Sequence, residues 1–249
     1  MERRPISRIL ILAVVALVLG VGCSRGSAVV QNTQTPPPTP TPTPTPRDIL
    51  NSASQRFAQV NSAHYQLQVQ GNVFLDSQRT LALRGASGDL ARPSSATAKA
   101  TVALAGANLT VNMIAIGQDE YITNFLTGRW ERAPQGLSYN PAILFDAQSG
   151  LPDVMSKVTS VTLVGVEDLD GVKTQHLRGT IQRADVQSLT GTAFQGNTIN
   201  LDIWLAEDTK DIHKVVLNDP GTGQGATATT WTLLITNINA PVTITAPSQ

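Results

Sequence analysis

The chain of 249 residues has a single cysteine, few aromatic side chains and few charges. One thiol excludes an intramolecular disulfide and any C-x-x-C metal or redox site. Charged residues make up 14% of the chain, and its 18 basic and 18 acidic groups balance; typical globular domains carry about 25% charged residues. A nucleic-acid partner is not expected, because such a partner normally requires a basic face.

Long apolar runs are also missing, apart from one near the N-terminus. Arg3, Arg4 and Arg8 precede an uninterrupted apolar run over residues 9–19. This run is short for a membrane span, which needs about 20 residues. A basic segment, a short apolar segment and small residues before a cleavage point are typical of a secretory signal peptide. We assign the signal peptide to residues 1–22.

The only cysteine lies at the end of this segment. The sequence Gly20-Val21-Gly22-Cys23 resembles the lipobox of bacterial lipoproteins, although Gly20 stands where leucine is usual and Leu19 lies one residue earlier. The resemblance implies cleavage before Cys23 and acylation of its thiol, and two or three acyl chains hold a protein stably on a membrane. We predict a lipid-anchored, extracytoplasmic protein of a bacterial cell envelope. The alternative is an ordinary cleaved signal with an incidental cysteine.

Residues 23–46 are expected to form a tether. The segment is small and polar before it enters a Thr-Pro repeat over residues 35–46. Proline disfavours helix at the preceding residue, so the repeat favours extended polyproline II. At about 3.1 Å per residue the repeat reaches roughly 35–40 Å. The folded domain is assigned to residues 47–249.

The domain begins with a helical pattern, capped by Asp48, and then changes to a period of two. Short connections between the strands favour antiparallel pairing. A change of phase at Ile114 and Ile116 suggests a bulge. The pattern predicts a mainly β (α+β) fold of about ten strands with two or three short helices. Strands are expected around residues 65–69, 81–83, 95–104, 109–117, 120–124, 129–132, 161–166, 176–181, 199–205, 212–217 and 230–238, and short helices around residues 140–158 and 184–189.

Several local motifs resemble one family. They are Gly85-Ala86-Ser87-Gly88-Asp89-Leu90 with Pro93, Gly150-Leu151-Pro152, the segments 165–172 and 177–180, and the segments 201–209 and 213–217. Together they resemble the mycobacterial LppX/LprA/LprF/LprG lipoproteins. The resemblance implies a LolA/LolB-like fold, in which a curved antiparallel sheet forms a half-barrel and short helices close its concave side. It also implies a cavity for lipid or glycolipid acyl chains, and transport of that lipid through the envelope.

The residues themselves supply apolar faces for such a cavity. Aromatic residues are only 4% of the chain, so few rings are available to fill the inside of a curved sheet. An ordinary packed core is the alternative reading of the same alternation. The candidate cavity residues are Leu67, Val69, Leu81, Leu83, Val102, Leu104, Leu109, Val111, Met113, Leu144, Phe145, Val154, Met155 and Val158. Met113, Phe145 and Met155 are favoured among them, since flexible side chains and a ring suit an adaptable wall.

Catalytic and metal-binding motifs are missing. No G-x-S-x-G elbow occurs. The three histidines, His64, His176 and His213, show no metal-ligand spacing and are expected on the surface. The Asp168–Gly171 segment lacks the later glutamate of a calcium loop. We therefore expect no enzyme activity, no metal and no cofactor.

These observations predict a membrane-anchored lipoprotein that binds lipid or glycolipid acyl chains and carries them within the envelope, with an envelope transporter as a candidate partner. One alternative is an envelope sensor that binds a protein partner, which predicts a filled core and an exposed apolar patch. A second alternative, an envelope hydrolase, requires a serine or carboxylate site that the sequence does not show.

Overall fold

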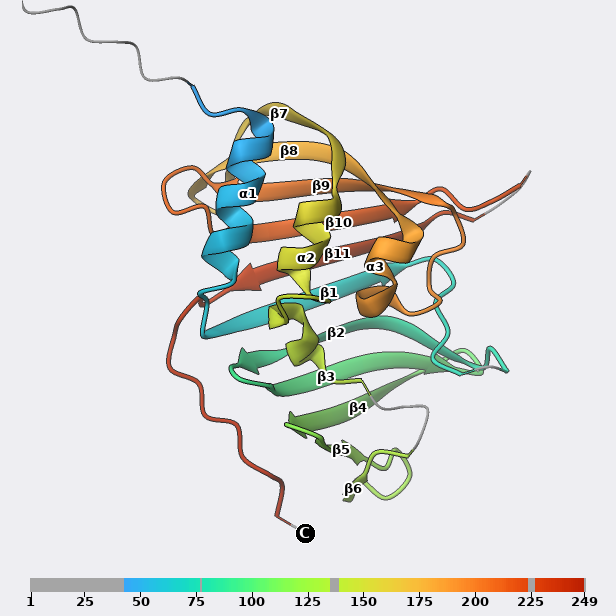
Figure 1. Ribbon diagram of the computed structural model, residues 1–249. Coiled ribbons are helices and arrows are strands. Elements are labelled where there is room, and N and C mark those ends of the chain that lie inside the picture. The colour runs from blue at the N-terminus through green and yellow to red at the C-terminus, as the bar shows by residue number, and fades with distance from the viewer. Residues whose placement is uncertain (1–42, 77, 135–138, 224–226, 249) are drawn as a thin grey trace, which may run out of the picture. The chain divides into compact units, whose positions relative to one another are not determined.

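Eleven strands among the described residues form one antiparallel sheet, with helices packed over one face (Figure 1). The computed structural model describes residues 43–76, 78–134, 139–223 and 227–248, and Thr43–Gln249 form one compact unit. The predicted signal peptide, Cys23 and most of the predicted tether lie outside the described residues. The strands are β1 (Ser62–Gln70), β2 (Leu81–Ala91), β3 (Ser95–Leu104), β4 (Ala107–Ile116), β5 (Asp119–Thr123), β6 (Trp130–Arg132), β7 (Thr159–Leu169), β8 (Val172–Gln182), β9 (Thr198–Ala206), β10 (Ile212–Asp219) and β11 (Thr229–Thr236).

The sheet is open and is built from two halves. Its strand order is β6-β5-β4-β3-β2-β1-β11-β10-β9-β8-β7, so β6 and β7 form its two edges. Within each half, consecutive strands pair with each other. The halves meet where β1 pairs with β11, with Leu67 opposite Leu233. The predicted mainly β fold, with an antiparallel and curved sheet, is confirmed.

In the described part of the chain, four short helices cover the concave face of the sheet (Figure 1). They are α1 (Pro46–Phe57), the 3₁₀ helix η1 (Pro141–Phe145), α2 (Leu151–Lys157) and α3 (Arg183–Thr190). Gly150 is the N-cap of α2, and a Cβ atom there would collide with the carbonyl oxygens of Ile143, Leu144 and Asp146. Among the residues described, no helix is long and apolar enough to cross a membrane.

The first helix begins one residue earlier than the assigned domain boundary, and its predicted cap is wrong. Thr45 is the N-cap, Pro46 occupies the first turn, and Asp48 is the N3 residue of a capping box. The Thr45 hydroxyl and backbone N–H bond to the Asp48 carboxylate and lower its pKa. A Thr side chain accepts from the N3 backbone while the N3 carboxylate bonds back to the cap, which satisfies two otherwise unpaired donors. Asp48 contributes to the cap from inside the helix.

The main hydrophobic core lies between the helices and the sheet, and most of its strand residues come from the C-terminal half. Helix α1 contributes Ile49, Leu50, Ala53 and Phe57, which are at most 6% exposed. The ring of Phe57 packs against Phe145 with centroids 5.4 Å apart. Apolar residues at spacings of three and four form this stripe, as the sequence pattern predicts.

The bulge predicted in β4 is not present. Strands β3 and β4 pair in one continuous register from Ser95–Ile116 to Leu104–Ala107, whereas a shift occurs between β2 and β3 at Leu83/Gly85. Ile114 is half-buried on the outer face of the sheet because it lies opposite Tyr121 of β5. An apolar cross-strand pair on the outer face therefore breaks the alternation without breaking the register.

Candidate functional site

A cavity of about 570 Å³ lies between the N-terminal half of the sheet and the covering helices. Its wall comes from β1 to β6, β10, β11, η1, the ends of α2 and α3, and the loops between these elements. One row of side chains crosses six adjacent strands in register and lines the cavity throughout. In order across the sheet this row is Val215, Leu233, Leu67, Ala86, Ala100 and Val111.

Small side chains at the centre of the sheet create the space. Ala86 and Ala100 lie opposite each other on β2 and β3, and Ala98 also lines the cavity. Residues directly opposite each other on antiparallel strands have Cβ atoms only about 5 Å apart, so large side chains at these positions would fill the space between the sheet and the helices. The alanines leave a hollow that the larger residues at both ends of the row enclose.

Nine of the fourteen predicted cavity residues line this space. They are Leu67, Leu81, Leu83, Val102, Leu104, Leu109, Val111, Met113 and Leu144. The structure brings them together because alternate residues of β1 to β4 point to the same concave face. Their role as contacts for a ligand stays a prediction.

Three of the other predicted residues belong to α2 and its end. Val154, Met155 and Val158 are 1% exposed and pack in the main core. Helix α1 lies beside α2, and the Arg47 guanidinium donates to the carbonyl oxygens of Met155 and Val158. These three residues therefore fill the interior beside α1 and lie outside the cavity wall, which α2 reaches only through Leu151 at its start.

Val69 and Phe145 also lie outside this wall. Val69 is 6% exposed and packs with Val73, Leu83 and Val102 in a second buried cluster. Phe145 stacks under the Arg92 guanidinium, 4.9 Å from its ring centroid. It lines a smaller, more polar cavity of about 480 Å³ on the other side of η1. Val69 shares the concave face of β1 with Leu67 but is covered by its buried neighbours, whereas Phe145 belongs to the other cavity.

Sequence reasoning missed two groups of wall residues. The alanines Ala86, Ala98 and Ala100 alternate on their strands, but their small size gave no signal of a wall. The second group comes from the C-terminal strands and includes Val215, Leu217, Trp231 and Leu233. Their alternation is visible in the sequence, but the β1–β11 pairing that brings them beside β1 is not.

Few polar atoms interrupt the apolar wall. The Tyr65 hydroxyl donates to the carbonyl oxygen of Thr97 at 3.2 Å, and burial raises the pKa of this phenol. Trp231 meets the ring of Phe194 edge to face, with centroids 5.8 Å apart. Among the buried side-chain nitrogen and oxygen atoms of the described residues, its Nε1 is the one without a hydrogen-bond partner. The wall therefore suits a ligand that is apolar over most of its length.

The cavity reaches the surface at one end of the sheet. Three large residues of its wall are exposed there: Leu75 is 39%, Phe125 57% and Tyr139 44% exposed. Leu75 lies between β1 and β2, and Phe125 lies between β5 and β6. We call this end the mouth of the cavity.

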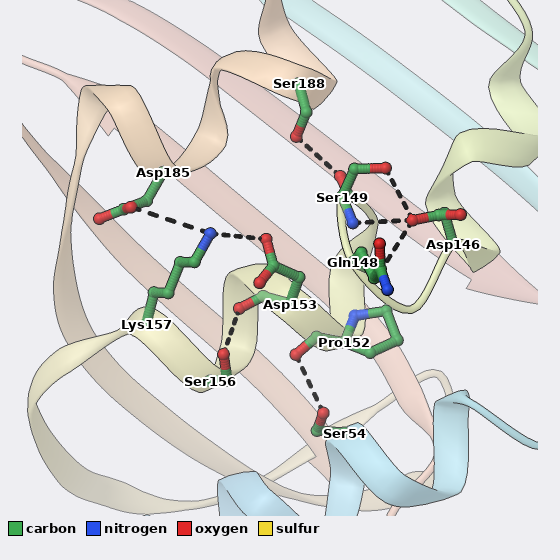
Figure 2. Close-up of polar contacts among 10 residues, drawn as sticks. All are labelled: Ser54, Asp146, Gln148, Ser149, Pro152, Asp153, Ser156, Lys157, Asp185 and Ser188. Carbon is green, nitrogen blue, oxygen red and sulfur yellow. Dashed lines mark hydrogen bonds and ion pairs between the residues drawn. The ribbon is translucent and has the colours of Figure 1, made fainter.

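Polar contacts tie the helical cover together on its outer side (Figure 2). The Ser54 hydroxyl of α1 donates to the carbonyl oxygen of Pro152 at 3.0 Å, and Ser188 of α3 donates to that of Ser149 at 2.7 Å. Lys157 lies 2.8 Å from Asp153 and 3.9 Å from Asp185. The segment from η1 to α2 is therefore linked to both α1 and α3.

A buried carboxylate fixes the loop beside the cavity wall after α3. Asp219, 1% exposed, accepts from the backbone N–H groups of Gln195 at 2.6 Å, Gly196 at 3.1 Å and Gly221 at 2.7 Å. Burial opposes ionisation of Asp219, but these donors outweigh it and lower its pKa below the ordinary 3.8. The carboxylate holds the segment that follows the wall residue Ala193.

We expect Asp219→Asn to destabilise the domain by about 1–3 kcal/mol at neutral pH, because an amide cannot accept all three N–H groups. The lowered pKa of Asp219 means that its contribution is present above the unfolded pKa and is lost as pH falls through the folded pKa. Urea unfolding should therefore show a difference between the two proteins that shrinks below about pH 4. A constant difference at all pH values would contradict this account. The exposed Asp208→Asn variant is the control, with an expected change within about 0.5 kcal/mol.

The prediction that the histidines lie on the surface is wrong for His176. This residue is 6% exposed and stacks on Trp204 with ring centroids 4.1 Å apart. Its Nδ1 lies 2.7 Å from Glu167 and its Nε2 lies 2.6 Å from Asp202. Hydrogen bonds from Trp204 and His176 lower the pKa of Glu167. The cluster joins β7, β8 and β9 on the face opposite the main core, so polar partners from neighbouring strands allow this ring to be buried.

No group of three His, Cys, Asp or Glu side chains converges as a metal site among the residues that the structure describes.

The open curved sheet, the helices over its concave face and the apolar cavity between them define a class of β protein with an internal ligand-sized cavity.

Sequence comparison identifies the family. The model of the LppX_LprAFG lipoprotein family matches residues 45–244, so the chain belongs to this family. The lipoarabinomannan carrier protein LprG of Mycobacterium tuberculosis is 24% identical over 209 residues, which cover 82% of each chain. The putative lipoprotein LprA of the same species is 24% identical over 166 residues, 64% of this chain and 66% of that one.

Two solved structures share the fold. LprF from Mycobacterium bovis has a TM-score of 0.66 at 20% identity and covers 84% of this chain and 100% of its own. LppX from Mycobacterium tuberculosis has a TM-score of 0.59 at 19% identity, over 80% of this chain and 98% of its own. The proteins in this family are described as lipoproteins or carriers, which agrees with the predicted family.

Proposed function

We propose that this protein is a membrane-anchored lipid carrier of the bacterial cell envelope, which holds the acyl chains of a lipid or glycolipid in the cavity. The observation that carries this proposal is the apolar cavity of about 570 Å³ with an apolar mouth. Each methylene moved from water into such a wall contributes about 0.8 kcal/mol. An acyl chain that moves from a membrane into the cavity then exchanges one apolar environment for another, so its free energy changes little.

The family and the fold support the same function. A relative with 24% identity is named a lipoarabinomannan carrier protein. The nine predicted residues in the cavity wall would contact the acyl chains, together with the alanines of β2 and β3. The sugar or other headgroup would remain near the mouth.

The N-terminal segment would supply the anchor. In this proposal residues 1–22 are removed as a signal peptide, Cys23 is acylated, and the residues up to 46 act as a tether. A polyproline-type tether lets the domain move away from its own anchor while it stays at the same membrane. An envelope transporter is a candidate partner that would supply or receive the lipid. The chemistry of the proposed function is binding and transfer, without a catalytic step.

We expect lipid to copurify with the protein. A chain that begins at Ser24 keeps all of the compact unit and lacks the anchor, so any acyl lipid found with it is bound without a covalent bond. Native mass spectrometry of this chain from a bacterial host should show extra mass that organic extraction releases as an acyl lipid. A clean mass of the free protein, with no uptake when phospholipid or glycolipid is added, would refute the carrier function and favour a protein partner.

A further inference from the structure

Exposed apolar side chains gather at the mouth of the cavity. Seven large apolar residues of the described chain are exposed, and three of these lie on the edge strand β7. The other four are Leu75, Phe125, Leu126 and Tyr139, of which all but Leu126 also line the cavity. Leu126 is 82% exposed, the most exposed of the seven. We call Leu75, Phe125 and Leu126 the mouth patch.

Hydrogen bonds within the two loops hold the mouth patch in place. The Asn124 side chain accepts from the backbone N–H groups of Leu126 and Thr127, at 2.9 and 3.1 Å. The Asp76 carboxylate accepts from the backbone of Thr80 and Leu81, at 2.9 and 2.7 Å. Polar backbone groups are thus satisfied inside the loops, while the apolar side chains remain in water.

Guanidinium groups accompany the mouth patch in both loops. Arg79 lies over the ring of Phe74, 4.8 Å from its centroid, and Phe74 lines the cavity beside Leu75. Arg129 is exposed and closes the loop that carries Phe125 and Leu126. Two carboxylates accept hydrogen bonds within the same loop or hairpin: Asp76 from the Thr80 hydroxyl, and Glu131 from the Asn124 amide. Apolar tips next to arginine are the pattern of a surface that enters the boundary between lipid headgroups and acyl chains.

We propose that the mouth patch docks on a lipid bilayer, with Leu126 and Phe125 entering the acyl region and with Arg79 and Arg129 at the headgroup phosphates. This inference rests on the proposed carrier function. The apolar surface continues from the patch into the cavity wall through Leu75 and Phe125, so an acyl chain passes from bilayer to cavity without crossing water. A bilayer would cover the patch and would also supply the contents of the cavity.

The test is flotation of the chain beginning at Ser24 with phosphatidylcholine vesicles and with vesicles that also contain phosphatidylglycerol. We expect Leu126→Asp to weaken vesicle binding about tenfold or more, because it removes a side chain that would be buried in the bilayer and adds a charge there. The matched control is Leu163→Asp on β7, where the leucine is 44% exposed but far from the cavity wall. It should bind vesicles as the unmodified chain does. Arg79→Gln with Arg129→Gln should remove only the preference for the phosphatidylglycerol vesicles.

A second measurement separates this proposal from the carrier function. Leu126 is not part of the cavity wall, so Leu126→Asp should take up a fluorescent fatty acid from aqueous solution as the unmodified chain does. Uptake from solution with no binding to either kind of vesicle would overturn the docking proposal and leave the carrier function standing. Equal loss of vesicle binding in the Leu163→Asp variant would also overturn it. So would a dimer in sedimentation experiments that Leu126→Asp converts to a monomer, because the patch would then bind a second copy. No uptake by the unmodified chain would refute the carrier function itself.

Discussion

An Ala100→Trp variant should lose long-chain lipid binding while it keeps its fold. Ala100 lies at the middle of the row of wall residues, opposite Ala86 on one side and Val111 on the other. An indole at this position projects into the hollow that the alanines leave. If it excludes about four methylenes, the loss is about 3 kcal/mol at ~0.8 kcal/mol each, which is more than a hundredfold in affinity. Titration with fluorescent fatty acids of two lengths measures the effect, which should be smaller for the shorter chain.

Ala103→Trp is the matched control, because it makes the same change on the same strand. Ala103 lies outside the cavity wall, three residues along β3 and on its other face. Fatty-acid affinity should be unchanged in this variant. The thermal transition of Ala100→Trp should stay close to that of the unmodified chain, since empty space accepts the ring with little of the 1–3 kcal/mol that overpacking typically costs. Equal affinities in the two variants would place the ligand outside the cavity.

The largest loss of stability is expected from Phe57→Ala. The Phe57 side chain is 1% exposed and packs against Phe145, so its removal leaves a void between α1 and η1. Truncations of this kind typically cost about 3–5 kcal/mol. For a domain of this size each kcal/mol corresponds to roughly 2–4 °C, so the midpoint of thermal unfolding should fall by about 10 °C. Circular dichroism on heating measures it.

Phe125→Ala provides the comparison for this stability experiment. The same truncation at a residue that is 57% exposed should change the free energy of unfolding by no more than about 0.5 kcal/mol. If Phe57→Ala unfolds at the same temperature as Phe125→Ala, α1 does not contribute to the cooperative unit. The helical cover would then be an independent element, and the contacts in Figure 2 would not stabilise the core.

Local patterns predicted most of the strands and helices correctly. The alternation of Tyr65, Leu67 and Val69 marks β1, and the Asp170-Gly171 turn lies between β7 and β8. These features depend only on neighbouring residues. The cap of α1 was harder, because Thr45 and Asp48 are both good cap residues and the capping box uses both. Only the backbone conformation, which is extended at Thr45 and helical from Pro46, shows where the helix begins.

The cavity wall was predicted in part for a similar reason. Alternation tells which residues of a strand share a face, and it correctly grouped Val102 with Leu104. It does not tell what lies across from that face. An apolar stripe on a helix gives the same signal whether it packs in the core or lines a cavity. Met155 of α2 packs in the core beside α1, whereas Leu144 of η1 lines the cavity. Likewise, the burial of His176 depends on Glu167 and Asp202, which come from two neighbouring strands.

The pairing of β1 with β11 also determines when the cavity can exist. Within each half, strands pair with their neighbours in sequence, and such local contacts form quickly. The seam between the halves joins opposite ends of the chain, and its closure carries the largest loop entropy. Leu67 of the first half and Leu233 of the last strand are both needed for the wall. During synthesis the N-terminal strands are made first and the final strand β11 last. The binding space therefore stays open until synthesis is finished, and we expect only complete molecules to take up lipid.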